Sequence, residues 1–194
     1  MEPILEIENI SLQFGGVKAL DSVTYHINQG EIFSLIGPNG AGKTSMLNCI
    51  SGLYQPTTGS IRYKGQEIIN MKPYNRTTLG MARAFQNIAL FAHMSVLDNL
   101  KLGRHSLMKA GIFSGGLYVG KASKEEIDHR QKVEEVIEFL DLQDIRHTPV
   151  GTLSYGLQKR VEVGRALALN PELILLDEPM AGMNNAEKDM MARF

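Results

Sequence analysis

The stretch Gly37-Pro38-Asn39-Gly40-Ala41-Gly42-Lys43-Thr44 decides the fold, because it matches the phosphate-loop pattern G-x-x-x-x-G-K-[ST] at every fixed position. Residues 32–36, just before it, form a short apolar run that predicts a buried parallel strand. Residues 42–50 predict a helix that starts near Gly42. Strand, glycine-rich loop and helix in this order are the context that a P-loop requires, so we predict that the chain binds a nucleoside triphosphate.

The residue types of this loop suit the chemistry of phosphate binding. Glycines let the backbone curl so that several N–H groups point at phosphate oxygens, and the helix N-terminus adds partial positive charge. Lys43 is expected to reach the β- and γ-phosphates, and the Thr44 hydroxyl to coordinate Mg²⁺. Ser45 completes the set of predicted nucleotide-binding residues that begins at Gly37.

Composition excludes several other classes of protein. The 194 residues are enough for one domain, and 43% hydrophobic with 21% charged residues is ordinary for a globular chain. A net charge of -1 gives no basic footprint for nucleic acid, so no nucleic-acid partner is predicted. The single Cys49 forms no internal disulfide and is predicted to be a small core residue. No signal peptide and no apolar run near 18 residues is present, which predicts a cytosolic protein able to sit on a membrane-embedded partner.

The N-terminal part predicts an antiparallel ribbon. Apolar residues partly alternate over residues 4–14 and again over residues 17–27, with the turn Gly15-Gly16 between them. Phe14 stands directly before that turn. On local evidence its ring either belongs to the core or stacks on a nucleotide base, and both alternatives stay open.

The middle of the chain changes character. Residues 91–150 read mainly as helix, with a capping box at residues 123–126 that predicts the start of a long helix and an apolar stripe from Ile127 to Leu140. The glycines of residues 111–120 predict a flexible connection. We therefore divide the chain into an α/β part at 1–90, a helical subdomain at 91–152 and a returning α/β part at 153–194.

Two further motifs lie in the returning part. Residues 173–176 are apolar and end in Asp177 and Glu178, as expected of a strand beside a P-loop. Asp177 is predicted to hold Mg²⁺, and Glu178 to polarise a water that attacks the γ-phosphate. Ser154-Tyr155-Gly156 starts a helix, which makes it a second anion-binding device, and this suggests a site completed across a dimer. The alternative is that Ser154 is a plain helix cap.

Together these motifs resemble the nucleotide-binding subunit of ABC transporters, over the chain from Phe14 to the region after Pro179. The resemblance implies an α/β P-loop core with an antiparallel ribbon and an inserted helical subdomain. It also implies ATP as the nucleotide and favours stacking of Phe14 on adenine. Gln86, preceded by a predicted short strand, falls at the position that contacts Mg²⁺ and the attacking water and borders the membrane subunit.

The same resemblance assigns roles to the last two motifs. Residues 153–158 correspond to the family signature, so Ser154 and Gly156 are expected to contact the γ-phosphate bound to the opposite subunit. Asp177 matches the Walker B aspartate and Glu178 the catalytic glutamate.

A narrower likeness is to the ATP-binding subunit of branched-chain amino-acid importers. It rests on residues 14–20, 80–87, 153–156 and 180–184. It implies an ATPase that powers uptake of branched-chain or hydrophobic amino acids from the cytoplasmic face of the inner membrane. The implied partners are integral-membrane permease subunits, a second ATP-binding subunit and, indirectly, a solute-binding protein.

The sequence departs from the family pattern at three places. Leu157 replaces the usual glutamine of the signature, and Asn184 replaces the usual aspartate of the D-loop. No histidine follows Glu178, where the family continues with a further strand and a histidine at the γ-phosphate. We expect a truncated subunit that lacks its last strands, with apolar faces exposed in the sheet and poor ATP hydrolysis. A soluble ABC ATPase outside transport and a nucleotide-binding fragment without turnover are the alternatives.

Overall fold

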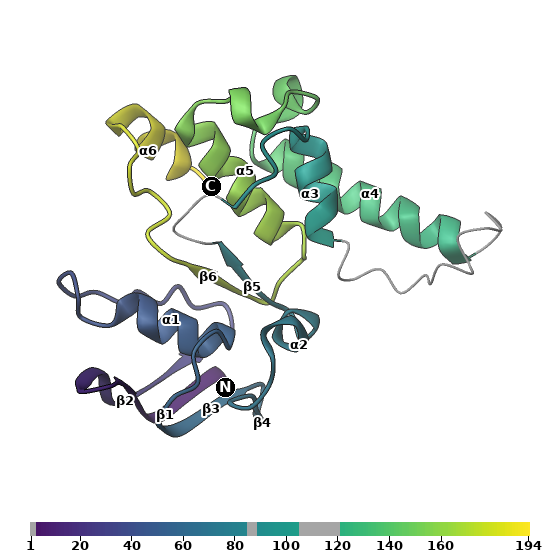
Figure 1. Ribbon diagram of the computed structural model, residues 1–194. Coiled ribbons are helices and arrows are strands. Elements are labelled where there is room, and N and C mark those ends of the chain that lie inside the picture. Colours follow the sequence, from purple (N-terminus) through teal and green to yellow (C-terminus); the bar gives the residue numbers. More distant parts are fainter. Residues whose placement is uncertain (1–2, 85–88, 105–120) are drawn as a thin grey trace. The chain divides into compact units, whose positions relative to one another are not determined.

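The computed structural model describes residues 3–84, 89–104 and 121–194 (Figure 1). The chain forms two compact units, Met1–Leu79 and Gly80–Phe194, which we call the N-terminal unit and the C-terminal unit. The architecture is mixed α/β, as predicted. The predicted three-part division at residues 90 and 152 stays a prediction.

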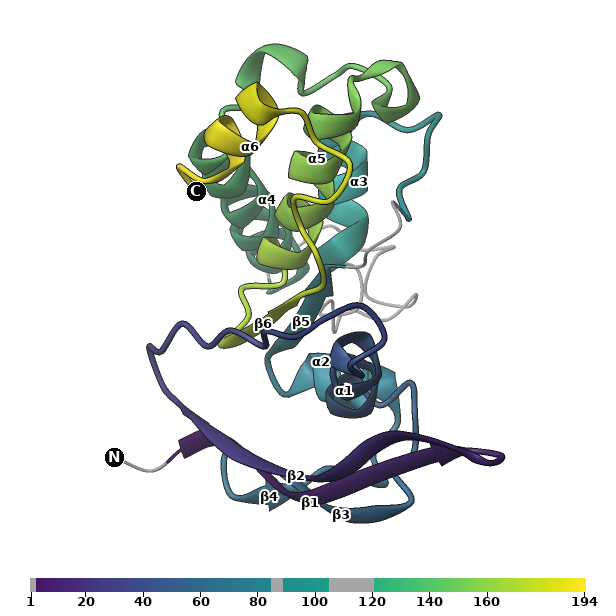
Figure 2. The ribbon, with the colours of Figure 1, turned by 90° about the vertical axis from the view of Figure 1, so that its left-hand side faces the viewer.

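The N-terminal unit is built on the predicted antiparallel ribbon. Strand β1 (Pro3–Phe14) pairs with β2 (Val17–Asn28), and its other edge pairs with β3 (Thr58–Tyr63), which is followed by β4 (Gln66–Glu67). The strand order is β2-β1-β3-β4, and helix α1 lies over one face of this sheet (Figure 2). The side chains that alternate onto the covered face are fully buried and include Leu5, Ile7, Ile10 and Ile61.

Helix α1 (Lys43–Ser51) follows the P-loop, as predicted. Its end is held by Arg76 of α2 (Pro73–Thr78), which is 2% exposed and donates hydrogen bonds to the carbonyls of Cys49 and Ile50 at 2.8 and 2.7 Å. A cation at a helix C-terminus meets the negative end of the helix dipole. Cys49 is fully buried, as predicted, and burial raises the pKa of its thiol to about 11, so the thiol stays protonated at neutral pH.

The predicted strand over residues 32–36 is wrong. This segment is irregular in the structure, and Ile32 and Ile36 are 97% and 93% exposed. Phe33 stacks on Tyr25 with ring centroids 4.9 Å apart. A strand needs a neighbour for its backbone hydrogen bonds, and within the described residues neither sheet offers this segment one. Residues 32–36 therefore have the composition of a buried strand but do not pair with a neighbouring strand in the described residues.

The C-terminal unit contains the two short strands predicted from sequence. Strand β5 (Met81–Ala84) and strand β6 (Leu173–Leu176) pair in parallel, with Ala82 opposite Ile174 and Arg83 opposite Leu175. Helices α5 (Tyr155–Leu167) and α6 (Asn185–Met191) supply further apolar side chains beside them. The buried members of this cluster are Ala82, Ala84, Val163, Ala166, Met183 and Met191.

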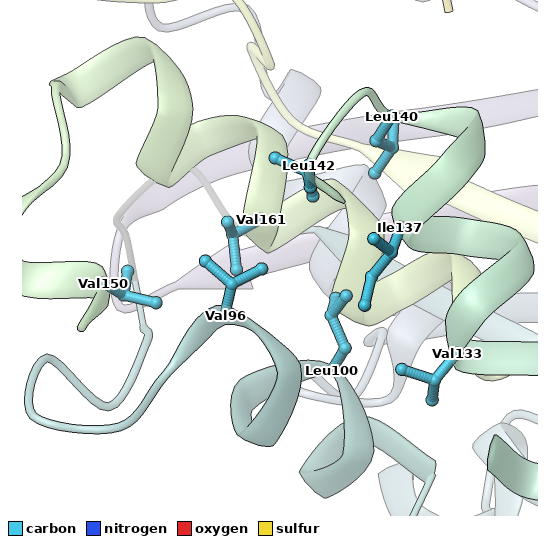
Figure 3. Close-up of a cluster of buried hydrophobic side chains, with 8 residues drawn as sticks. All are labelled: Val96, Leu100, Val133, Ile137, Leu140, Leu142, Val150 and Val161. Atoms are coloured by element: carbon cyan, nitrogen blue, oxygen red, sulfur yellow. The ribbon is translucent and has the colours of Figure 1, made fainter. Parts of the chain in front are cut away.

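A second cluster holds the helices of the C-terminal unit together (Figure 3). It lies where α3 (Val96–Arg104) and α4 (Lys121–Phe139) pack beside α5, with short 3-10 turns at Gln143–Ile145 and Val150–Thr152. Its buried members are Val96, Leu100, Val133, Ile137, Leu140, Leu142, Val150 and Val161.

Two details of the predicted long helix are wrong, and the connection predicted before it lies outside the described residues. Helix α4 begins at Lys121, so Ser123 lies inside the helix and not at its N-cap, a shift of the size that is common at helix ends. Ile127 is 63% exposed and so does not join the apolar stripe, whereas Val133 and Ile137 are buried. The predicted flexible connection at residues 111–120 lies outside the described residues.

Candidate functional site

The P-loop has the backbone shape that its glycines predict. Gly40 and Gly42 have φ values of 84° and 85°, in the left-handed region that favours glycine. Gly42 is the N-cap of α1. A Cβ atom at Gly42 would lie 2.5 Å from the carbonyl oxygen of Ala19 and 2.9 Å from Cδ2 of Leu20, so only glycine fits where the loop passes β2.

Lys43 points back into the loop. Its Nζ donates hydrogen bonds to the carbonyl oxygens of Gly37 and Pro38 at 2.7 and 2.9 Å. The first turn of α1, residues 43–46, contains no acidic side chain, so the positive end of the helix dipole is not neutralised from within that turn. An ammonium group and a helix N-terminus at one loop are the elements of a phosphate site.

Phe14 is accessible. It is 48% exposed and packs edge-on against Tyr54, with ring centroids 5.2 Å apart and an interplanar angle of 77°. Such exposure does not fit the alternative that the ring belongs to the core. Stacking of Phe14 on adenine stays a prediction.

Asp177 stands at the end of β6 and is 4% exposed. Arg83 of β5 approaches it, with Nη2 at 3.1 Å from Oδ2, and the Arg83 side chain is 8% exposed. The sequence analysis did not single out Arg83. The available signal is a basic residue inside the short strand Met-Ala-Arg-Ala that precedes Gln86.

Glu178 differs from its neighbour in two respects. Its side chain is exposed whereas Asp177 is buried, and its backbone has φ 48°, which is uncommon for a residue other than glycine. The carbonyl of Glu178 accepts a hydrogen bond from the amide of Ala181 at 3.0 Å, which fixes the turn after β6. Backbone held in this region often marks a functional site.

The helix start at Ser154 is joined to the start of α6 by one carboxylate. Ser154 is the N-cap of α5, as predicted, and its Oγ accepts from the amide of Leu157 at 3.4 Å. The amide of Gly156 donates to Oε1 of Glu187 at 3.1 Å. Oε2 of Glu187 accepts from the amide of Asn184 at 3.0 Å, within a reciprocal capping box that opens α6. Asn184, a departure from the family pattern, thus serves as a helix cap.

The predicted site residues divide between the two units. Phe14 and residues 37–45 belong to the N-terminal unit, and Ser154, Gly156, Asp177 and Glu178 belong to the C-terminal unit. Gln86 lies outside the described residues. The structure therefore describes each half of the predicted site but leaves the roles of these residues as predictions.

The donor set suits magnesium. The Thr44 hydroxyl and the Asp177 carboxylate are hard oxygen ligands, which Mg²⁺ prefers. Over residues 3–84, 89–104 and 121–194, no three His, Cys, Asp or Glu side chains gather in a way that could hold a metal ion. Few protein ligands are typical of Mg²⁺ at phosphate sites, where substrate oxygens and waters complete the coordination.

Comparison with known families identifies the class of protein to which the chain belongs. The family model described as "ABC transporter" matches residues 20–181. This range includes the P-loop, helix α5 and strand β6, which directly precedes Asp177. The chain belongs to the ABC transporter family, as an ATP-binding cassette.

Its relatives include ATP-binding proteins of branched-chain amino acid transport. The high-affinity branched-chain amino acid transport ATP-binding protein BraF of Pseudomonas aeruginosa is 35% identical over 187 residues, covering 96% of this chain and 73% of that protein. LivG of Escherichia coli K12, described by the same words, is 35% identical over 186 residues with the same two coverages. The spermidine/putrescine import ATP-binding protein PotA of P. aeruginosa is 38% identical over 189 residues, which is 47% of its length.

Solved structures agree with this assignment. The ADP conformation of MJ1267, an ATP-binding cassette of an ABC transporter, superposes with a TM-score of 0.83 at 34% identity, over 100% of this chain and 75% of that one. A nucleotide-free ATP-binding cassette superposes with a TM-score of 0.81 at 35% identity, over 99% and 76%. The predicted α/β cassette fold is confirmed.

The contact between Gly156 and Glu187 yields a testable prediction. A Cβ atom at Gly156 would lie 2.6 Å from Oε1 and 2.7 Å from Cδ of Glu187, so Gly156→Ala must displace that carboxylate from two backbone amides. We expect Gly156→Ala to lower the free energy of unfolding by about 1–2 kcal/mol, measured by urea denaturation.

The matched control is the same substitution in a Glu187→Ala background. There the added methyl group meets no carboxylate, so Gly156→Ala should cost clearly less than in the wild-type chain. Equal costs in the two backgrounds would contradict the contact.

Proposed function

We propose that the chain binds ATP with Mg²⁺ and hydrolyses it, as the motor subunit of an importer for branched-chain or hydrophobic amino acids. The observation that carries this proposal is the P-loop, where Lys43 and the start of α1 converge on one loop in a chain of the ABC transporter family. The names of BraF and LivG support the amino-acid solute.

In this proposal the N-terminal unit binds the triphosphate. The loop amides and Lys43 take up the β- and γ-phosphate oxygens, because the carbonyls that now accept from Lys43 are weaker partners than an anion. Phe14 offers an exposed ring to the adenine base. Thr44, Asp177 and Gln86 hold Mg²⁺, which when bound neutralises charge that develops on the phosphates.

Glu178 is the proposed general base. Its exposed carboxylate accepts a proton from, or orients, the water that attacks the γ-phosphate, so that ADP and inorganic phosphate leave. Asp177 is unsuited to that role because it is buried and paired with Arg83. In this proposal Glu178 activates the water and Asp177 binds the metal ion.

The assembly is proposed to contain two nucleotide-binding subunits on membrane permeases. Ser154 and Gly156 are proposed to contact the γ-phosphate held by a second ATP-binding subunit, and hydrolysis would then reopen the pair. The site of action is the cytoplasmic face of the inner membrane, with a solute-binding protein as an indirect partner. Among the described residues, none of the helices combines the length and the apolar character needed to cross a bilayer.

Substitution of Glu178 tests the catalytic part. Glu178→Gln keeps the size of the side chain but removes the base, so single-turnover hydrolysis of ATP should fall by roughly 10²- to 10⁴-fold while ATP affinity stays within about threefold. Glu138→Gln, the same change at an exposed position on α4, should leave both unchanged. Full hydrolysis by Glu178→Gln would refute the role of Glu178.

A copurification experiment tests the transport part. The chain should bind detergent-solubilised permease subunits of a branched-chain amino-acid importer. It should not bind the permease subunits of a spermidine/putrescine importer taken from the same organism as the first importer. The choice of pair follows from the two kinds of relative. Binding to neither permease would favour an ABC ATPase outside transport, and preference for the polyamine permease would overturn the proposed solute.

A further inference from the structure

The buried pair of Arg83 and Asp177 is not explained by the proposed catalytic roles. Both side chains are almost fully buried, at 8% and 4% exposure, and Nη2 of Arg83 lies 3.1 Å from Oδ2 of Asp177. The pairing is fixed by parallel registration of β5 and β6, in which Arg83 lies opposite Leu175, two residues before Asp177. Both residues belong to the C-terminal unit, so the contact is internal to that unit.

A buried carboxylate is costly without a compensating positive charge. Arg83 supplies such a charge, and a guanidinium keeps it at all physiological pH values. The same guanidinium is unfavourable for a metal ion, because a divalent cation that approaches Asp177 meets a like charge in a poorly solvated place. Stabilisation of Asp177 and recruitment of the metal ion therefore work against each other at this carboxylate.

We propose that Arg83 is a permanent counter-ion of Asp177 and that it raises the Mg²⁺ concentration at which the site is half-saturated. It stabilises the metal-free chain and weakens the interaction of Asp177 with Mg²⁺. The inference rests on the proposed function, in which Asp177 helps to hold the Mg²⁺ of the bound nucleotide. Arg83 acts through Asp177 and is a positioning residue in this account.

The test compares two substitutions of Arg83. Arg83→Met removes the charge but keeps an unbranched apolar stem, and Arg83→Lys keeps the charge. Binding of a fluorescent ATP analogue is titrated with Mg²⁺ to obtain the half-saturating Mg²⁺ concentration, and the midpoint of thermal unfolding is measured in EDTA and in saturating Mg²⁺ with ATP. Neither readout needs hydrolysis.

We expect Arg83→Met to lower the half-saturating Mg²⁺ concentration by roughly fivefold or more, the low end of usual coupling factors. The same variant should unfold at a lower temperature in EDTA, with a smaller loss in Mg²⁺ and ATP. Arg83→Lys should stay close to the wild type in the Mg²⁺ titration. Arg62→Met, which removes a surface cation that lies 3.4 Å from Glu8, is the matched control and should change neither quantity.

The outcomes separate this inference from the proposed function. An unchanged or raised half-saturating Mg²⁺ concentration in a folded Arg83→Met variant overturns the counter-ion role. Absence of ATP binding in the wild type refutes the proposed function instead. If Arg83→Met does not fold in EDTA, adding Asp177→Asn should restore folding by removing the buried negative charge, and failure to restore it would also overturn the proposal.

Discussion

The close approach of Gly42 to β2 constrains the whole N-terminal unit. At this point the chain leaves the P-loop and starts α1, with so little space that a Cβ atom would lie 2.5 Å from the carbonyl of Ala19. The contact ties the loop to the antiparallel ribbon, and Arg76 fixes the far end of the same helix through two of its last carbonyls. The helix is thereby anchored at both ends, and its positive N-terminus and Lys43 are presented at one loop.

In the C-terminal unit, two adjacent carboxylates lie in different environments. Asp177 is buried beside Arg83, whereas Glu178 is exposed on a backbone turned into the left-handed region. Two neighbouring carboxylates with different surroundings can take different chemical roles. A third carboxylate, that of Glu187, joins the starts of α5 and α6 by accepting from the amides of Gly156 and Asn184.

Local signals in the sequence predicted much of this architecture. The P-loop helix, the ribbon around Gly15-Gly16, the strand before Asp177 and the cap at Ser154 each depend on a few consecutive residues, and the structure confirms them. The contacts that sequence analysis missed are non-local. Arg83 and Asp177 are 94 residues apart, and Gly156 and Glu187 are 31 apart, so neither pair is visible without strand register or helix packing. The failed strand at residues 32–36 has the same cause, because strand pairing depends on a neighbour that an apolar run does not specify.

The most direct test of the account is calorimetric titration of the chain with ATP in the presence of Mg²⁺, for the wild type and for Lys43→Ala. Lys101→Ala, at an exposed position on α3, serves as the control. We expect saturable binding by the wild type and the control, and at least about a tenfold loss of affinity for Lys43→Ala, because a charge-assisted phosphate contact is removed. Equal affinity of Lys43→Ala and the wild type, or no binding by the wild type, would contradict the claim that this P-loop is the nucleotide site.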